Sequence, residues 1–300
     1  MKRLTARQGY TLVELLIAVA ILGIMGTMVA QLMMSQQRFF QRMTEQTGVR
    51  RELRTALGTL PTELRGISSP GRDISAFGGS SITFRATIGT SFVCEKSSNA
   101  SLDVPPVNTA RTSTSNWVST PAVGDTIFAL RHDSSGVSGD FWSAHRITNV
   151  SSGAGFCATS PFIDPTLDAG KVRFRFTVTP TLPDPVTTGS ALRFTRSARY
   201  ELASQTSGRW FLQRQELVGG AWTTPVVLSG PYLPPQANGT GGMALTYFDS
   251  TGASVALGGD ARRIARIDVA LRALGQTGSQ RNTAAPHDSV RLSIAMRNRR

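Results

Sequence analysis

The stretch that decides the fold runs from Arg7 to Met34 and reads RQGYTLVELLIAVAILGIMGTMVAQLMM. It joins a short basic leader to a long apolar run, and Glu14 is the carboxylate inside that run. A charged side chain in bilayer hydrocarbon costs about 2.5–3.5 kcal/mol on insertion scales, so an intramembrane charge indicates a functional site. The run from Leu15 to Met34 is long enough to cross the hydrocarbon, which takes about 20 apolar residues.

The charges that flank the apolar run predict its orientation. Lys2, Arg3 and Arg7 precede the run, so the positive-inside rule keeps residues 1–9 in the cytoplasm. The rest of the chain would then lie in the periplasm, on the outer side of the inner membrane. An ordinary secretory signal or a plain signal anchor is the alternative interpretation. That alternative leaves Glu14 unexplained. Ala18 and Ala20 have the spacing of a signal-peptide cleavage site, but they lie in the middle of the run rather than after it.

The leader ending in Gly9, the aromatic Tyr10 and the carboxylate of Glu14 together resemble the class III signal of type IV prepilins and pseudopilins. The resemblance implies that prepilin peptidase cuts between Gly9 and Tyr10 and methylates the new amino group of Tyr10. It also implies that Glu14 pairs with the mature N-terminus of a neighbouring subunit, because an opposite charge offsets an unpaired charge in the membrane. The family more often has phenylalanine where this chain has Tyr10.

The helix is expected to continue beyond the membrane. Apolar side chains recur at three- and four-residue steps through residues 35–65, which is the pattern of an amphipathic helix. Pro61 is expected to end or kink it. Gln31 stands where major pilins often have a helix-breaking proline, and this favours a minor pilin or a pseudopilin. The stripe consists of Phe39, Met43, Arg50, Leu53, Leu57, Leu60 and Leu64, with Arg50 as the polar exception.

After residue 66 the composition changes to Ser, Thr, Gly and Pro with short apolar runs, which predicts a β-rich body. We therefore expect an α+β protein. Its long N-terminal α-helix, transmembrane at 10–34 and amphipathic at 35–65, would pack on an antiparallel β-sheet body at 66–300. The Ser- and Pro-rich segment 97–122 is expected to be an exposed insertion. Strands are predicted at 81–87, 126–131, 144–150, 172–178, 198–203, 209–217, 226–228, 245–249, 267–271 and 290–296.

Cys94 and Cys157 are the two cysteines of the chain. Neither belongs to a CxxC pair and no histidine cluster stands nearby, which argues against zinc. In an oxidising compartment a disulfide between them is the economical interpretation, and two separate buried thiols are the alternative. A disulfide that closes a loop of about 60 residues is worth about 4 kcal/mol in the chain-entropy model.

No catalytic residue, metal or cofactor is predicted, and we expect a protein that is not an enzyme. His132-Asp133 and His287-Asp288 are neighbours in sequence, and neighbours on a strand point to opposite faces, which argues against a catalytic group. Asp249 could begin a calcium loop, but one carboxylate is too few for an ion that takes six to eight oxygens.

The body is similar to the PilW-like minor pilins and, more distantly, to the J-type pseudopilins of type II secretion. The similarity lies in Tyr200-Glu-Leu, in the Trp210–Arg214 and Leu245–Asp249 strands, and in the closing Ile264–Leu271 and Arg297–Arg299 segments. It implies a minor pilin that primes or caps a type IV pilus at its tip. The implied partners are prepilin peptidase, other minor and major pilins and the inner-membrane assembly platform.

Two other functions are alternatives at this point. One is a minor pseudopilin of a type II secretion system, since the same signal serves both systems. The other is a DNA-uptake or adhesion module, because the formal net charge is +13 and +10 remains once the leader is removed. A basic body attracts polyanions in general. High charge alone is a weak sign of nucleic-acid binding, so this alternative ranks last.

Overall fold

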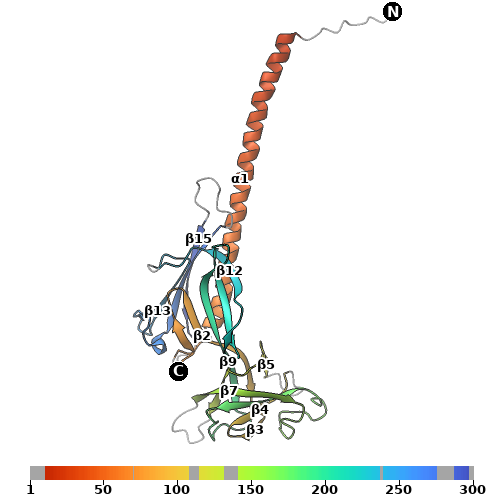
Figure 1. Ribbon diagram of the computed structural model, residues 1–300, viewed down its shortest axis with the longest axis vertical. Helices are drawn as coiled ribbons and strands as arrows, with labels where there is room; N and C mark the ends of the chain where they lie inside the picture. The colour runs from red at the N-terminus through yellow and green to blue at the C-terminus, as the bar shows by residue number, and fades with distance from the viewer. Residues whose placement is uncertain are drawn as a thin grey trace, which may run out of the picture.

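The structure is a computed structural model, and it describes residues 11–69, 71–107, 115–131, 141–236, 239–275 and 287–296. A long helix, α1 (Leu12–Leu64), spans 53 residues, about 80 Å at 1.5 Å per residue. Its first half stands clear of the rest of the chain, and its second half lies against a β-rich body (Figure 1). The predicted α+β class, a long helix with an antiparallel sheet, is confirmed.

Antiparallel strands and one turn of 3-10 helix, η1 (Ala261–Arg263), make up the regular structure of the described body. Each strand that the sequence predicts overlaps one of those observed. The strands are β1 (Ile74–Phe77), β2 (Ser81–Phe92), β3 (Glu95–Ser98), β4 (Ser101–Val104), β5 (Asn116–Trp117), β6 (Thr126–Arg131), β7 (Phe141–Gly153), β8 (Arg173–Thr179), β9 (Ala191–Ser204), β10 (Trp210–Val218), β11 (Ala221–Trp222), β12 (Val226–Tyr232), β13 (Met243–Phe248), β14 (Arg266–Leu274) and β15 (His287–Ala295).

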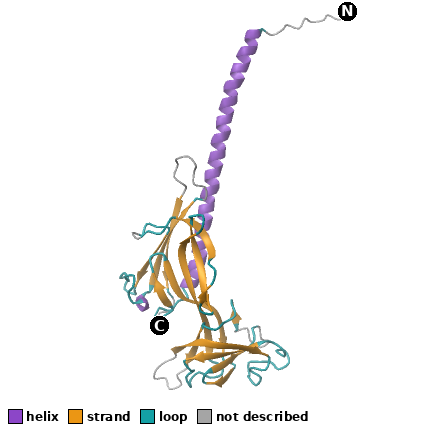
Figure 2. Cartoon of the chain, viewed as in Figure 1, coloured by secondary structure: helices purple, strands orange, loops and turns teal. Residues whose placement is uncertain are grey.

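The body has two lobes, which share one continuous sheet (Figure 2). The spine lobe packs against one face of the second half of α1 and contains β1, β10 and β12–β15. The distal lobe lies beyond the end of α1 and contains β3–β8. The long strands β2 and β9 pair along their length and pass through both lobes. The sequence left open whether the β region forms one unit or two, and the described residues contain a separate hydrophobic core in each lobe.

The second half of α1 packs into the spine lobe with one face. Its buried face is shorter than the predicted stripe, because the body covers the helix only from Val49 onward. Phe39 and Met43 lie before that point and are exposed. Each buried leucine side chain contributes about 1.5–3 kcal/mol relative to leaving it in water. The buried side chains of α1 are Val49, Leu53, Ala56, Leu60, Pro61 and Leu64.

Pro61 does not end the helix, which continues to Leu64. A proline inside a helix removes one backbone hydrogen bond and costs about 3 kcal/mol. Here Leu60, Pro61 and Leu64 are all buried in the core of the spine lobe. We attribute the extra turn to this packing, which offsets the lost bond.

The segment 97–122 differs from the expected exposed insertion. β4 lies inside it, pairs with β8, and buries Leu102 and Val104. Asp103 between them is fully buried and accepts two hydrogen bonds from Arg175, at 2.7 and 2.8 Å. Trp117 packs on an aromatic cluster in the distal core. Both described ends of the segment therefore belong to the sheet, and residues 108–114 lie outside the described residues.

An irregular segment at 154–172 connects β7 to β8 in the distal lobe. The Cys94–Cys157 disulfide fastens it, with the two Cα atoms 5.7 Å apart. Regular alternation along the strand predicted at 172–178 would put Val172, Phe174 and Phe176 on the buried face and Arg173 outside, but Val172 is 54% exposed and Arg173 is buried. The guanidinium of Arg173 is turned inward because it donates to backbone carbonyls of this segment, those of Ala154, Phe156 and Asp168.

The two lobes meet on β9, between residues 195 and 198. Thr195 pairs with Thr126 of β6 and Ala198 pairs with Glu216 of β10, so β9 changes its neighbour here. Arg196 lies at this change, and its five N–H groups donate at 2.6–3.1 Å to both Asp125 carboxylate oxygens, to Glu216, to Ser119 and to the carbonyl of Thr120.

The Arg196–Asp125 pair is almost completely buried, with 6% and 2% of the two side chains exposed. The hydrogen bonds to Asp125 raise the pKa of Arg196, against the effect of burial. A guanidinium with every donor satisfied is one of the few charged groups that can be buried without a large net cost. This side chain therefore links β9 and β10 to Asp125, at the start of β6 in the distal lobe.

We expect Arg196→Ala to lower the free energy of unfolding by about 3–5 kcal/mol, because Asp125 would remain buried without its partner. The measurement is denaturant unfolding of the purified full-length chain. Arg262→Ala is the control, since its pair with Asp260 at 2.8 Å is largely exposed, with 55% and 41% of the two side chains accessible. Such exposed pairs are worth about 1 kcal/mol or less. Equal losses in the two variants would contradict the importance of the buried pair.

Candidate assembly site

The first half of α1 is apolar and uncovered. The exposed fractions of its large hydrophobic side chains run from 48% at Met34 to 78% at Leu12. Exposed apolar surface on this scale is unfavourable in water and marks a surface that binds membrane or protein. By length and composition, this is the one helix in the described residues that could cross a membrane.

Glu14 lies in the first turn of α1 and forms a capping box with Thr11. The Glu14 N–H donates to the Thr11 hydroxyl at 3.3 Å, and Glu14 Oε2 accepts from the Thr11 N–H at 3.0 Å and from its hydroxyl at 3.2 Å. A carboxylate is favourable here because the first turn of a helix has free N–H groups and a partial positive charge. The carboxylate is thus held at the start of the helix and remains exposed.

The comparisons with known proteins bear on this end of the chain. Residues 4–30 match the family described as the prokaryotic N-terminal methylation motif. The chain carries a type IV prepilin-like signal. No curated protein and no solved structure matches the chain.

The prepilin-like signal supports a type IV pilin or pseudopilin class for the protein. It implies that prepilin peptidase acts on the chain and that pilins in general are its partners. Together with the apolar first half of α1, it indicates a single-pass membrane anchor. The predicted cleavage and methylation residues, Gly9 and Tyr10, lie outside the described residues and stay predictions. The structure places Glu14 two residues inside the described start of the helix.

Polar contacts fix the other end of this helix in the spine lobe. Glu63, in the last turn of α1, forms a bidentate pair with Arg214 of β10, with N–O distances of 3.2 and 3.1 Å. The hydroxyl of Tyr200 on β9 donates to Glu63 at 2.8 Å. Burial raises the pKa of Tyr200 well above its usual range, and the charge of Glu63 adds to that rise. The tyrosine therefore stays a neutral donor to the helix.

The same arginine continues toward the distal lobe. Arg214 donates to Glu216 at 2.6 Å, and Glu216 accepts from Arg196 at 3.1 Å. Burial lowers the pKa of Arg214, but the bond to Glu216 and the charge of Glu63 raise it by more, so its pKa lies above the usual range. We call the series Glu63, Arg214, Glu216, Arg196 and Asp125 the ionic chain. It runs from the end of α1 to the distal lobe, a feature that sequence spacing gave no means to find.

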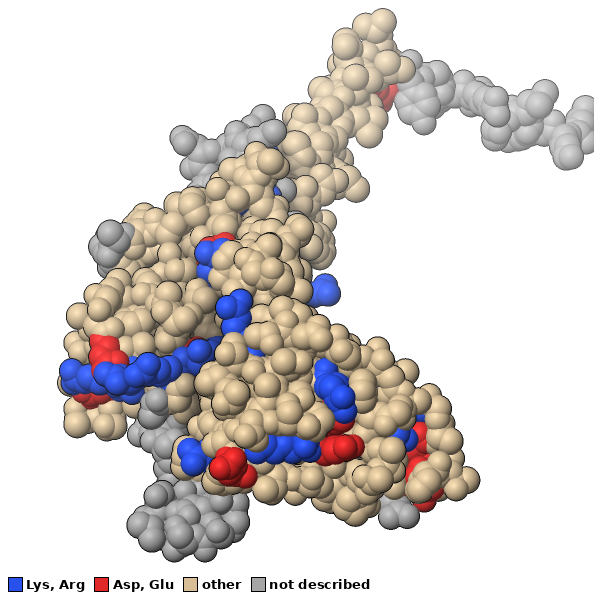
Figure 3. Space-filling view, turned by 60° about the horizontal axis from the view of Figure 1, so that its bottom comes forward, with Lys and Arg blue, Asp and Glu red and all other residues tan. Residues whose placement is uncertain are grey.

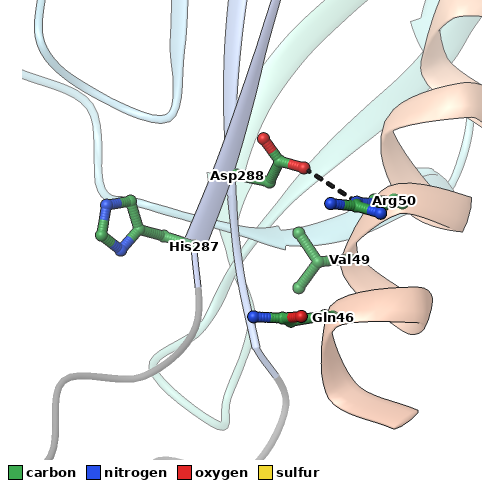
Figure 4. A pocket seen from close by; sticks show the side chains of 5 residues that line it. All are labelled: Gln46, Val49, Arg50, His287 and Asp288. Carbon is green, nitrogen blue, oxygen red and sulfur yellow. Dashed lines mark hydrogen bonds and ion pairs between the residues drawn. The ribbon is translucent and has the colours of Figure 1, made fainter. Parts of the chain in front are cut away.

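A small hollow of about 180 Å³ lies between α1 and the start of β15 (Figure 4). Gln46 and Val49 of the helix line it, and Arg50 donates to Asp288 across it at 3.4 Å. Both side chains of this pair are largely exposed, 67% and 45%, so the pair contributes little to stability. Arg50, predicted as the polar exception on the buried stripe, thus lies at the rim of the helix–body contact.

The histidines of the described residues do not form a catalytic group. His287 and Asp288 point to opposite sides of β15, as strand alternation predicts (Figure 4). His145 is buried, with Nδ1 2.8 Å from the carbonyl of Pro180 and Nε2 2.8 Å from the hydroxyl of Ser143. His132 lies outside the described residues. In the part of the chain that is described, no group of three His, Cys, Asp or Glu is placed to hold a metal ion.

The turn considered for calcium is closed by its own hydrogen bonds. Asp249 accepts from the hydroxyl and N–H of Thr251 and the N–H of Ala253, and its second oxygen accepts from Arg263. The bond from the Thr251 hydroxyl contributes most to lowering the pKa of Asp249 to about 2. Asp260 is engaged by Arg262 in the same way. Both carboxylates therefore stabilise their own turns through hydrogen bonds and ion pairs within the chain.

Burial lowers the pKa of His145 below 6.5, so acidification should destabilise the fold through this residue. Between that lowered value and pH 6.5 the unfolded chain binds more protons than the folded chain, and stability falls as pH falls. We expect His145→Gln to lose less stability than the wild type between pH 7.5 and pH 5.5, measured by denaturant unfolding. His287→Gln, at an exposed position, should follow the wild type. Parallel curves for wild type and His145→Gln would contradict this assignment.

Proposed function

We propose that this protein is a minor type IV pilin, a structural subunit that primes or caps pilus assembly after prepilin peptidase cleaves between Gly9 and Tyr10. Its role is to take a place in a filament, and the proposal assigns no catalytic residue and no cofactor. In this role the body is periplasmic before assembly and reaches the pilus tip afterwards. Other pilins and the inner-membrane assembly platform are the proposed partners.

The observation that carries the proposal is the uncovered first half of α1 with Glu14 at its start. A helix that displays this much apolar surface is stable in hydrocarbon or among other apolar helices. The prepilin-like signal at the same place supplies the means to pass from one to the other, because cleavage frees an amino group that a neighbour's carboxylate can pair with. Glu14 of one subunit would therefore set the position of the next.

The position of the distal lobe favours the end of a filament. The lobe extends the molecule beyond the end of α1, along its long axis (Figure 1). In a filament whose subunit helices run parallel to its axis, this lobe would extend away from the membrane segment, into the space of a subunit on that side. The continuous α1, with no break at Gln31, is consistent with a specialised subunit rather than the repeated one.

The polyanion-binding alternative has less support. On the face drawn in Figure 3, basic side chains lie in short strips next to acidic ones rather than in one broad patch. Several arginines of the body are engaged with buried carboxylates, among them Arg175, Arg193 and Arg196. These three arginines are already paired and would gain little from a polyanion. The pseudopilin alternative shares the same signal and differs in where the filament is found.

Mass spectrometry of the protein from membranes tests the processing. We expect a mature chain that begins at Tyr10 and carries one additional methyl group on its amino terminus. An amino terminus at any other residue would contradict cleavage by prepilin peptidase. Recovery of the chain in filaments sheared from the cell surface would support the pilus, and recovery only from the cell envelope would favour the pseudopilin alternative.

Substitutions at the start of α1 test the role of the carboxylate. Glu14→Val and Glu14→Gln should leave membrane insertion intact and reduce incorporation into sheared filaments about tenfold or more, because each removes the charge that pairs with the neighbour's amino group. Thr11→Val is the control, since it keeps the carboxylate and the Thr11 N–H that holds it. Wild-type incorporation of Glu14→Gln would show that the charge is not needed.

A further inference from the structure

A second exposed face of α1 continues beyond the apolar half, on the side of the helix that the body does not cover. We call it the outer stripe. Its residues follow one another at three- and four-residue steps, which places them on one face of the helix, turned away from the buried face that starts at Val49. All are exposed. The outer stripe consists of Phe40, Met43, Thr47, Arg51, Arg54 and Gly58.

The outer stripe is apolar in its first part and basic in its second. Phe40 and Met43 are 66% and 49% exposed. Arg51 and Arg54 have no ion pair with any carboxylate in the described residues. The stripe therefore offers an apolar contact followed, two to three helical turns further on, by two free positive charges.

In a second copy of the chain, the carboxylates of α1 are not placed to form ion pairs with Arg51 and Arg54. Glu45, Glu52 and Glu63 are only partly exposed and lie toward the body. Glu52 accepts the N–H of Gly230, and Glu63 is held by Arg214. Glu14 is the one fully exposed carboxylate in the described helix, and it lies at the far end. No register of two such helices brings an exposed carboxylate of the second half to Arg51, and an in-register pair sets like charges against each other.

We propose that the outer stripe binds the helix of a different pilin-like subunit, one that presents carboxylates opposite Arg51 and Arg54 and apolar or small side chains opposite Phe40 and Met43. The inference rests on the proposed function, because it assumes that the chain assembles with other pilins. It goes further by naming the surface and the charge of the partner. Apolar contact supplies attraction, and the arginines select the partner by rejecting a second copy of the chain.

An acidic copy of the chain itself provides a defined probe. Two differently tagged full-length copies, each with Thr47→Cys on the outer stripe, are co-expressed in one membrane and joined by oxidation. The native cysteines are already paired with each other. One copy keeps Arg51 and Arg54, and the other carries R51E/R54E. We expect about fivefold more mixed dimer than between two copies with the native arginines, because two ion pairs replace repulsion.

R38E/R42E is the matched control, because it reverses two exposed arginines that lie on another face, in line with Val49. That pairing should give no more mixed dimer than two native copies. Equal yields for the native pair and the R51E/R54E pair would overturn the proposal. So would an equal gain from R38E/R42E, since the effect would then be one of net charge rather than of the outer stripe.

Filament incorporation separates this inference from the proposed function. In the native cell, R51E/R54E should reduce incorporation into sheared filaments several-fold at unchanged membrane level, and R38E/R42E should not. Normal incorporation of R51E/R54E would overturn the outer-stripe proposal while leaving the minor pilin proposal standing. Absence of the wild-type chain from filaments would overturn the minor pilin proposal, and the cross-linking result would still decide the charge selectivity of the stripe.

Discussion

One helix has to satisfy two different environments, and the rest of the structure depends on this constraint. The first half of α1 has no protein around it and is apolar on every face, whereas the second half is apolar on the one face that enters the spine lobe. A helix that is apolar all round belongs in hydrocarbon or in a helix bundle, and one with a single apolar face belongs on a domain. The point at which burial begins, Val49, fixes where the body stands relative to the membrane segment.

The body is organised to hold that helix and then to extend past it. β2 and β9 run through both lobes, so the distal lobe is an extension of the same sheet rather than a domain on a flexible linker. At the place where β9 changes its neighbour, Arg196 bonds to groups from both lobes. The ionic chain that begins at Glu63 in the last turn of α1 ends there, at Asp125. One connected group of charges therefore joins the end of the helix to the distal lobe across the spine lobe.

In the proposed assembly, neighbouring subunits recognise α1 at two positions along its length. At the start of α1 the recognition is a single carboxylate, held by Thr11 and exposed. Farther along, beyond the apolar run, the outer stripe combines two apolar side chains with two unpaired arginines. In the proposed function the first feature is shared by every subunit of a filament, and the second distinguishes one kind of neighbour from another. A subunit that repels its own copy through the second feature is suited to a position that is occupied once.

The sequence by itself determined the class of the protein, because the leader, Glu14 and the apolar run are local features whose meaning does not depend on distant residues. It also determined most of the strands, since alternation is local too. The tertiary structure alone decided the division into two lobes, the strand β4 within a Ser- and Pro-rich segment, and the inward turn of Arg173. In each of these the outcome depends on a partner far away in sequence: β8 for β4, backbone carbonyls for Arg173, and Asp125 for Arg196. Local patterns carry no information about such partners, because burial of a charge is decided by whether the fold brings a matching group to it.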